Sequence, residues 1–259
     1  MFWLLQSGFF DAGAFAALRA CLDAHDVAHA VVAVNTRTLA LAPEPQPAPG
    51  ERVFACGSSS LGRACRARGW TPGYFDDNLD ARMLARHYGE HMLNADAQFV
   101  PLREAEPCGE TVFVRPASDL KPFAGGVMTR AEFLAWRDAT LSDIARGTQP
   151  RLAADDAVVL ARPKSIHAEV RLRVVDGRIV GASLYRRGGA AFFSDAVDES
   201  FLAFGRERIA QWVPDRAFCL DVADTPDGLR VVEINSINSS AFYATDIARF
   251  VEAIEHMAF

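Results

Sequence analysis

Three oxygen-bearing side chains near the end of the chain have the types and spacing of a metal site. Asp221 lies in the first strand of a predicted hairpin whose turn falls near residues 226–228, and Glu233 and Asn235 lie in the second strand. Strand alternation places Glu233 and Asn235 on one face, with Asp221 roughly diagonal to Glu233, about 7–8 Å away. Carboxylate and amide oxygens suit Mg²⁺, but spacing does not exclude a solvated hairpin face with coincidental acids.

A second predicted hairpin, residues 167–186, carries charged residues on one face. Alternation places His167, Glu169, Arg171 and Arg173 together, while the residues in between are apolar and predict core; Asp176-Gly177 supplies the turn. This face has two interpretations. It is either an exposed surface of cross-strand salt bridges or a surface that binds phosphate and ribose, with Arg171 as its fixed positive charge.

A third basic region follows the predicted strand 110–116. Arg115 stands at the strand end, Lys121 lies in the next loop, and Gly125 and Gly126 allow a backbone to approach a ligand closely. The loop lacks the G-x-x-x-x-G-K-[ST] pattern of a P-loop. By itself it also fits an ordinary turn with solvated basic residues.

Two further motifs are poor candidates for chemistry. The segment "HYGEH", residues 87–91, matches the zinc pattern H-x-x-E-H, but Gly89 weakens the helix that would align the histidines and no third ligand is evident. The segment "CGSSSLG", residues 56–62, has Leu61 where a nucleophile elbow requires glycine. We therefore expect a surface helix at the first motif and helix-capping serines at the second.

The elements that must position these residues change character along the chain. Strands at 2–6, 28–34 and 52–57 alternate with helices at 11–26 and from Ser58 onward, which predicts a small parallel sheet, and a further helix is predicted at 78–93. After about residue 106 the pattern becomes antiparallel hairpins, with a helix at 129–146 that begins at a Thr129–Glu132 capping box. We expect an N-terminal α/β domain over 1–105 and an α+β domain over 106–259.

Composition limits the class of protein. Half of the 259 residues are hydrophobic, the net charge is −6 and the pI is about 5.5. This balance argues against broad binding to nucleic acid or to anionic membranes. The five cysteines are far apart and form no Cys-x-x-Cys pair, which favours reduced thiols. With no basic signal region and no apolar run near the ~20 residues of a membrane span, we expect a cytoplasmic protein.

Several stretches together resemble the ATP-grasp superfamily. "FVRPASDLKPFAGGV" is similar to its phosphate-contacting strand, "LARPKSIHAEVRLRVVDG" to its adenine hinge and E-x-R strand, and "CLDV…LRVVEINSINS" to its terminal metal motif. With "PGYFDDN" and "HYGEHMLN", the chain more narrowly resembles a phage-associated clade marked by an arginine and two lysines. The resemblance implies the ATP-grasp fold: two α+β subdomains that grip a nucleotide, here after a small parallel α/β N-terminal domain.

The resemblance also implies roles, position by position. Arg115 stands where most ATP-grasp enzymes have a lysine that contacts phosphate. The residues expected to bind ATP are Arg115, Lys121, Leu160, Arg162, Lys164 and Glu169; those expected to act in catalysis are Arg115, Lys121 and Arg171; and the expected metal ligands are Asp221, Glu233 and Asn235. For the substrate we expect Arg186 or Arg187, in a lid at 185–195, and Asn238 near a second metal or the transferred phosphate.

The implied activity is ATP-dependent ligation of a carboxylate to an amine. It would use Mg²⁺, pass through an acyl phosphate and release ADP and phosphate, with a small molecule or a peptide as substrate. A kinase or a non-catalytic nucleotide-binding module would carry the same nucleotide motifs, whereas a structural protein would bind no nucleotide. The sequence identifies neither the two substrates nor the oligomeric state.

Overall fold

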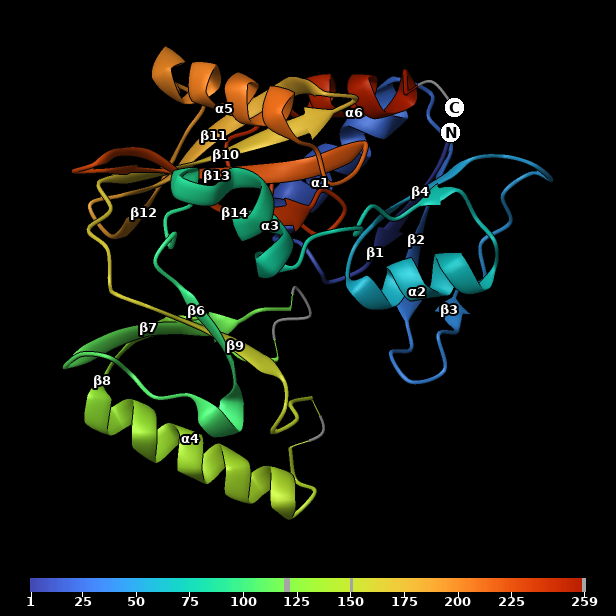
Figure 1. The fold of residues 1–259 in the computed structure, drawn as a ribbon. Coiled ribbons are helices and arrows are strands. Elements are labelled where there is room, and N and C mark those ends of the chain that lie inside the picture. The colour runs from blue at the N-terminus through green and yellow to red at the C-terminus, as the bar shows by residue number, and fades with distance from the viewer. Residues whose placement is uncertain (119–121, 150, 258–259) are drawn as a thin grey trace. The chain divides into compact units, whose positions relative to one another are not determined.

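The computed structural model describes residues 1–118, 122–149 and 151–257 and divides the chain into two compact units (Figure 1). Unit 1 consists of Met1–Asp77, Ala168–Val222 and Ile234–Phe259, and unit 2 of Asn78–His167 and Ala223–Glu233. The domain boundary expected at residue 105 therefore differs from the division into these two units, because unit 1 combines the N-terminal segment with segments from the second half of the chain.

The N-terminal part of unit 1 is the expected parallel sheet. Its elements are β1 (Phe2–Gln6), α1 (Ala12–Ala24), β2 (His29–Val34), β3 (Leu41–Ala42), β4 (Val53–Cys56), α2 (Ser59–Ala67) and β5 (Pro72–Gly73). The strand order is β3-β2-β1-β4-β5, and every pair is parallel except β2 with β3. Asp11 begins α1 by accepting a hydrogen bond from the amide of Ala14, which satisfies one of the unpaired N–H groups of the first turn.

A second, five-stranded sheet in unit 1 contains both predicted hairpins. Its elements are β10 (Ala168–Val175), β11 (Arg178–Arg187), β12 (Ala190–Ser194), α5 (Glu199–Gln211), β13 (Ala217–Thr225), β14 (Gly228–Ser236) and α6 (Ile247–Glu255). The order is β12-β11-β10-β13-β14, with the tip of the β13–β14 hairpin counted in unit 2. Asp176 and Gly177 both have positive φ, as the predicted hairpin turn requires. Helices α5 and α6 cover one face of this sheet (Figure 1).

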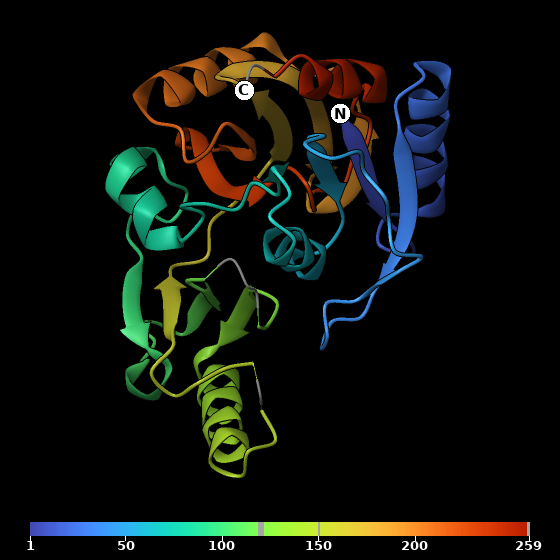
Figure 2. The same cartoon turned by 90° about the vertical axis from the view of Figure 1, so that its right-hand side faces the viewer.

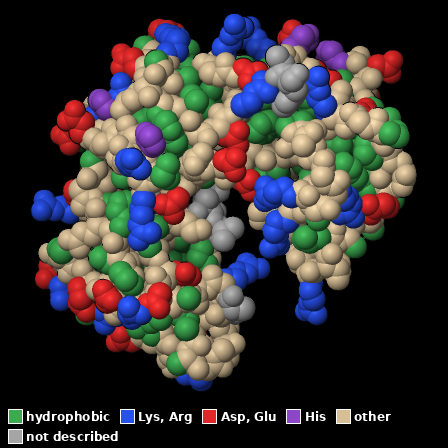
Figure 3. Space-filling model, turned by 45° about the vertical axis from the view of Figure 1, so that its right-hand side comes forward, with side chains coloured by type: hydrophobic (Ala, Val, Ile, Leu, Met, Phe, Trp, Pro, Cys, Tyr) green, Lys and Arg blue, Asp and Glu red, His purple; other side chains and the backbone are tan. Residues whose placement is uncertain are grey.

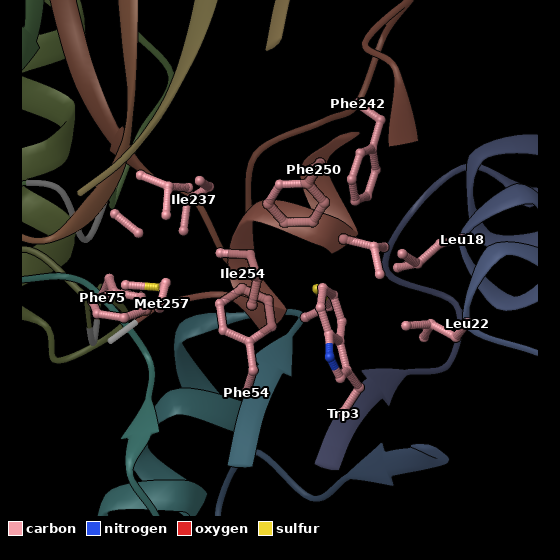
Figure 4. Packing of buried hydrophobic residues seen from close by; sticks show 14 of the residues in the cluster. Trp3, Leu18, Leu22, Phe54, Phe75, Ile237, Phe242, Phe250, Ile254 and Met257 are labelled. Carbon is pink, nitrogen blue, oxygen red and sulfur yellow. The ribbon is translucent and has the colours of Figure 1, made fainter. Parts of the chain in front are cut away.

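One core joins the first and last segments of unit 1. Trp3 packs edge-on against Phe54 and Phe250, with ring centroids 4.7 and 5.9 Å apart (Figure 4). The Trp3 indole also donates a 2.5 Å hydrogen bond to Glu255 of α6, which accepts a second from the terminal ammonium of Met1 at 3.1 Å. The two sheets of unit 1 are thus held by one apolar cluster, and Met1 at the start of the chain lies against α6.

Unit 2 is built on a four-stranded antiparallel sheet with one long helix (Figure 2). Its elements are α3 (Ala81–Tyr88), η1 (Gly89–His91), β6 (Gln98–Pro101), η2 (Leu102–Glu104), β7 (Thr111–Pro116), β8 (Gly126–Thr129), α4 (Arg130–Ala145) and β9 (Ala157–Ala161), with strand order β6-β9-β7-β8. The predicted capping box is confirmed, since Thr129 and Glu132 cap each other at the start of α4. Phe133 of α4 is fully buried against this sheet.

The helix expected at 78–93 is shorter in the structure. It runs only over Ala81–Tyr88, because Gly89 takes a φ of +52° and ends it, and a single 3₁₀ turn follows. His87 and His91 therefore do not share a continuous helical face. Strand β6, counted with the N-terminal domain in the sequence-based division, pairs with β9 and belongs to the sheet of unit 2.

The mixed-charge face of the β10–β11 hairpin is buried. Glu169 is 5% exposed, Arg171 7% and Arg173 0%, which excludes an exposed salt-bridge surface. The Arg173 guanidinium donates to the carbonyl oxygens of Ser240 and Ala241 at 2.9 Å and lies 4.4 Å above the ring of Phe242. This arginine therefore anchors the segment that follows β14.

The outer surface shows no single dominant charge on the face that Figure 3 displays, where basic and acidic side chains are interspersed. Among the described residues, none of the helices combines the length and apolar composition needed to cross a bilayer.

Candidate functional site

Asp221 on β13 is a buried carboxylate with well-defined partners. It is 1% exposed. The guanidinium of Arg171 on β10 donates two hydrogen bonds to it, from Nε to Oδ1 at 2.8 Å and from Nη2 to Oδ2 at 2.7 Å. The Asn235 amide Nδ2 donates to the same Oδ2 at 3.1 Å. Burial by itself lowers the pKa of Arg171, but the charge and hydrogen bonds of Asp221 outweigh it and hold that pKa well above its ordinary value. The guanidinium of Arg171 therefore stays charged inside the protein, beside Asp221.

Aromatic rings continue this cluster within unit 1. The Arg171 guanidinium lies 5.6 Å from the ring centroid of Tyr185 and 5.2 Å from that of Tyr243, and the two rings stack at 5.0 Å. Cations favour such positions over electron-rich ring faces. Tyr185 and Tyr243 were not predicted as site residues. Tyr185 could have been suspected because it lies on the hairpin strand opposite Glu169, but nothing in the sequence marks Tyr243.

Glu169, the first residue of the E-x-R pair, accepts two hydrogen bonds. The Tyr185 hydroxyl donates to Oε2 at 2.7 Å and Arg186 Nη1 donates to Oε1 at 3.0 Å. Burial, followed by the charges of Asp221 and Glu169, raises the pKa of Tyr185 far above its ordinary value. The phenol therefore stays protonated and remains a donor to Glu169. Of the two substrate arginines expected in the sequence, Arg186 is thus already paired.

In unit 2, Arg115 at the end of β7 is paired with Glu233 of β14. Nη1 lies 3.0 Å from Oε2, and the two side chains are 13% and 20% exposed. The predicted phosphate-contacting arginine and one predicted metal ligand are thus direct neighbours. Gly125 passes close by, since a Cβ on it would lie 3.0 Å from Cβ of Arg115. The glycine expected to approach a ligand therefore lies against this arginine.

The expected adenine hinge borders a cavity of about 440 Å³ in unit 2. Leu160 and Arg162 line it together with Gln98 and Cys108. The volume lies in the range of ligand pockets, and its lining is both apolar and polar. Lys164, nearby in the chain, pairs with Asp96 through Nζ–Oδ1 at 2.7 Å. Lys121 lies outside the described residues.

Asn238 has a different environment from the one expected. Its side chain is fully buried, with Nδ2 donating to the carbonyl oxygens of Ala55 at 2.6 Å and Gly73 at 3.4 Å, and Oδ1 accepting from the amide of Phe75 at 2.8 Å. These bonds tie the segment after β14 to the parallel sheet. Both polar atoms of the Asn238 side chain are therefore already hydrogen-bonded within unit 1.

Comparison with known proteins adds the family. The profile that matches residues 63–254 describes an ATP-grasp domain, family 3 of the clade named for one arginine and two lysines. No curated protein sequence matches the chain.

Solved structures with the same fold cover nearly the whole chain. An ATP-grasp RimK domain protein from Sphaerobacter thermophilus is 19% identical, with a TM-score of 0.58 over 93% of this chain and 92% of that one. The D-alanine–D-alanine ligase from Bacillus anthracis complexed with ATP is 12% identical, with a TM-score of 0.59 over 99% and 92%. The ATP-grasp ligase PsnB, complexed with a variant of its minimal precursor, Mg and ADP, is 15% identical, with a TM-score of 0.55 over 98% and 97%. At these identities the likeness establishes a shared fold.

Proposed function

Since this chain belongs to family 3 of the ATP-grasp clade named for one arginine and two lysines, we propose that it is an ATP-dependent ligase that joins a carboxylate to an amine. The reaction would form an acyl phosphate and release ADP and phosphate. Three kinds of support converge on it: the family, the expected nucleotide and metal residues, and structural neighbours that include ligases with ATP or with Mg and ADP.

One observation carries the proposal: the carboxylate of Asp221, only 1% exposed, accepts two hydrogen bonds from the guanidinium of Arg171 and one from the side-chain amide of Asn235. An ionised carboxylate is costly to bury unless charges and hydrogen bonds compensate it. Perturbed, buried titratable groups with specific charge partners are typical of functional sites. A chain that needed only stability could place an apolar residue at this position.

Asp221, Glu233 and Asn235 have the donor chemistry for Mg²⁺. Their oxygens are the hard ligands that this ion prefers, and Glu233 and Asn235 are two positions apart on β14, which places them on one strand face. Glu233 is paired with the guanidinium of Arg115, and Asp221 with that of Arg171. Positive charge therefore already compensates both carboxylates. Bound Mg²⁺ would neutralise charge on the β- and γ-phosphates.

The remaining expected residues would bind ATP. The backbone at Leu160 and Arg162 would take the adenine beside the 440 Å³ cavity, and Glu169 would take the ribose hydroxyls. Arg115, Lys164 and Lys121 would contact the phosphates. Arg115 offers a planar fork rather than the point charge of a lysine, so it can hold two phosphate oxygens at once.

The proposed reaction has two steps. A substrate carboxylate oxygen attacks the γ-phosphorus, the bond from that phosphorus to the β–γ bridging oxygen breaks, and ADP leaves. The amine nitrogen then attacks the acyl carbon, phosphate leaves with the carbon–oxygen bond electrons, and the nitrogen loses a proton to solvent. Arg171, fixed by Asp221, would supply positive charge toward the oxyanion of the second step. Arg187 would attract the substrate carboxylate.

The test is ADP and phosphate formation with MgATP and pools of amino acids or short peptides. We expect ADP and phosphate to rise together only when a carboxylate and an amine are both present, with no AMP. Glu233→Gln should abolish turnover, whereas Glu252→Gln, on the exposed side of α6, should leave it unchanged. ADP formation without any need for an amine would identify a kinase instead, and AMP as product would exclude the acyl phosphate.

Binding is tested separately from turnover. The melting temperature should rise with ATP only when Mg²⁺ is present. Folded protein whose melting temperature does not change at millimolar MgATP would exclude the nucleotide site itself.

A further inference from the structure

Tyr243, in the segment between β14 and α6, has a backbone conformation that tyrosine rarely adopts. Its φ is +53°, in a region where glycine and asparagine are common and a bulky side chain is strained. Such conformations persist only where the surrounding structure holds them, and they cluster at functional sites. A segment that only had to turn here would be better served by glycine. The ring of Tyr243 must therefore make contacts that compensate for the strained backbone.

The segment around Tyr243 is fixed on both sides. Before it, Phe242 is 1% exposed and packs against Phe250 of α6, with the ring centroids 5.5 Å apart (Figure 4). After it, the backbone amide of Ala244 donates to the Ser183 hydroxyl of β11 at 3.0 Å. The packing of unit 1 therefore sets the position of the Tyr243 ring.

The ring of Tyr243 joins two others in a three-ring stack. It lies 5.0 Å from the ring centroid of Tyr185 at an interplanar angle of 13°, and 5.2 Å from that of Phe193 at 23°. The guanidinium of Arg171 lies 5.2 Å from the Tyr243 centroid and 5.6 Å from the Tyr185 centroid. Two rings of the stack therefore contact the arginine that pairs with Asp221.

Asp221 and the two tyrosines restrain Arg171 in different ways. Asp221 accepts hydrogen bonds from Nε and Nη2, which fixes one edge of the planar guanidinium. The rings of Tyr185 and Tyr243 hold the plane itself, because a guanidinium stacks on aromatic faces. The remaining nitrogen, Nη1, forms no hydrogen bond with any described residue and so can donate to a ligand. The rings therefore decide where Nη1 points.

We propose that Tyr243 is a positioning residue for Arg171: its ring fixes the plane of the guanidinium so that Nη1 donates to an oxygen of the substrate's acyl group. The inference rests on the proposed function, in which Arg171 acts in the step where the amine displaces phosphate. A donor stabilises that step only if it lies at the oxygen on which negative charge develops. A guanidinium that is already in place needs no reorganisation during the reaction, which gives the strained tyrosine a function.

Three substitutions separate the ring from the backbone strain. Tyr243→Phe keeps the ring and the strain, Tyr243→Leu removes the ring but keeps a side chain at positive φ, and Tyr243→Gly removes both. The two variants without a ring therefore differ in strain and share the loss of the stack. Phe9→Leu, which alters another exposed ring of unit 1, is the control and should change neither readout below.

The position of Arg171 is measured in the protein alone, by ¹⁵N NMR of arginine-labelled samples in which Arg171→Lys assigns the Nε–H signal. We expect exchange of this Nε–H with solvent to be at least about tenfold faster in Tyr243→Leu and Tyr243→Gly, and within about twofold of the unaltered rate in Tyr243→Phe, because protection falls when a buried group opens more often. The Nε–H of Arg208, a buried arginine 5.1 Å from the ring of Phe204, should keep its rate in every variant.

Catalysis supplies the second readout, with the carboxylate and the amine that the substrate pools identify. Without the ring, kcat for the ligated product should fall at least about tenfold while the KM for ATP stays within about twofold. ADP should then form in excess of product, because the amine step is the one that slows. Tyr243→Phe should retain kcat and coupling, and the leucine and glycine variants should be equally impaired whatever their melting temperatures.

The outcomes separate this inference from the proposed function. Unchanged Nε–H exchange in Tyr243→Leu overturns the inference, as does a kcat that follows melting temperature rather than the presence of the ring. Full and coupled activity in Tyr243→Leu also overturns it, because the plane of Arg171 would then not matter to the reaction. If no substrate pool is turned over although the exchange depends on the ring, the ligase function fails while the positioning of Arg171 by Tyr243 stands.

Discussion

Arg115 and Glu233 form an ion pair with a distance of 3.0 Å from Nη1 to Oε2, joining the end of β7 to β14. The residues are far apart in the sequence, and each was expected to serve the nucleotide for a separate reason. Their contact means that a change at either one also alters the charge balance of the other. Experiments on Arg115 must therefore separate loss of a phosphate contact from release of Glu233.

The first prediction concerns Arg115→Lys. Lysine keeps the charge but loses the planar fork, so one charge-assisted hydrogen bond of about 1.5–3 kcal/mol should be lost, a decrease of roughly ten- to a hundredfold in kcat/KM for ATP. Steady-state kinetics with MgATP measure this effect. Arg130→Lys, at the start of α4, is the control. If Arg115→Ala retains full activity, this arginine does not contact the phosphates.

A second substitution isolates the ion pair. Arg115→Ala leaves Glu233 without its guanidinium, and the double variant Arg115→Ala/Glu233→Gln removes that excess charge. We expect the double variant to recover stability relative to Arg115→Ala but to remain inactive, because both groups are proposed to serve the nucleotide. Thermal unfolding and ADP formation on the same samples give the two readouts.

The second prediction concerns the buried pair of Arg171 and Asp221. Asp221→Asn removes one charge and leaves the other uncompensated, which should lower the free energy of unfolding by about 3–5 kcal/mol. Replacing both residues by apolar ones, Arg171→Met with Asp221→Leu, should restore much of that stability. The double variant should nevertheless lose the Mg²⁺-dependent thermal shift with ATP. Retention of that shift would contradict the role of Asp221 as a metal ligand.

The third prediction concerns Asn238. Asn238→Ala leaves the amide of Phe75 and the carbonyl of Ala55 buried without their partner, at about 1–3 kcal/mol for each unsatisfied group. Urea unfolding should show the loss. The hydroxyl of Ser239 forms no hydrogen bond with any described residue, so the control substitution Ser239→Ala should leave the free energy of unfolding nearly unchanged. At a temperature where Asn238→Ala is folded, its KM for ATP should be close to that of the unaltered protein. A large rise in KM would instead show that Asn238 contributes to the nucleotide site.

The fourth prediction follows from the buried cysteines. Burial raises the pKa of Cys56 and of Cys65 to about 12, from 9.0, against the opposing influence of nearby arginines. Above pH 9 the unfolded chain therefore binds fewer protons than the folded one. The contribution of each buried thiol to the free energy of unfolding is complete below pH 9. It declines by about 1.4 kcal/mol per pH unit for each thiol as the pH rises toward 12.

Urea unfolding under reducing conditions from pH 8 to 10.5 measures that slope. Cys65→Ala should reduce it by the share of one thiol, whereas Cys108→Ala, at an exposed position, should leave it unchanged. An identical slope in Cys65→Ala and in the unaltered protein would contradict a raised pKa at Cys65.

Structural elements that are determined by interactions within a few neighbouring residues could be predicted from the sequence. The Thr129–Glu132 capping box, the Asp176-Gly177 turn and the strand–helix alternation of the parallel sheet all depend on short-range propensities and hydrogen bonds, and the structure contains each of them. Gly89 could also have shortened the predicted helix 78–93, since its effect on the helix end is local. The family could be identified because its motifs are short, continuous stretches.

Only the tertiary structure decided which of the charged residues are partners. Alternation placed Glu169, Arg171 and Arg173 on one face, but whether that face is solvated or buried depends on the segment after β14, which covers Arg173 through Ser240, Ala241 and Phe242. The pairing of Arg171 with Asp221, the commitment of Asn238 to the parallel sheet and the common core of the chain's two ends join residues far apart in sequence. Such contacts follow from how the whole chain packs its apolar surface, which no local pattern encodes.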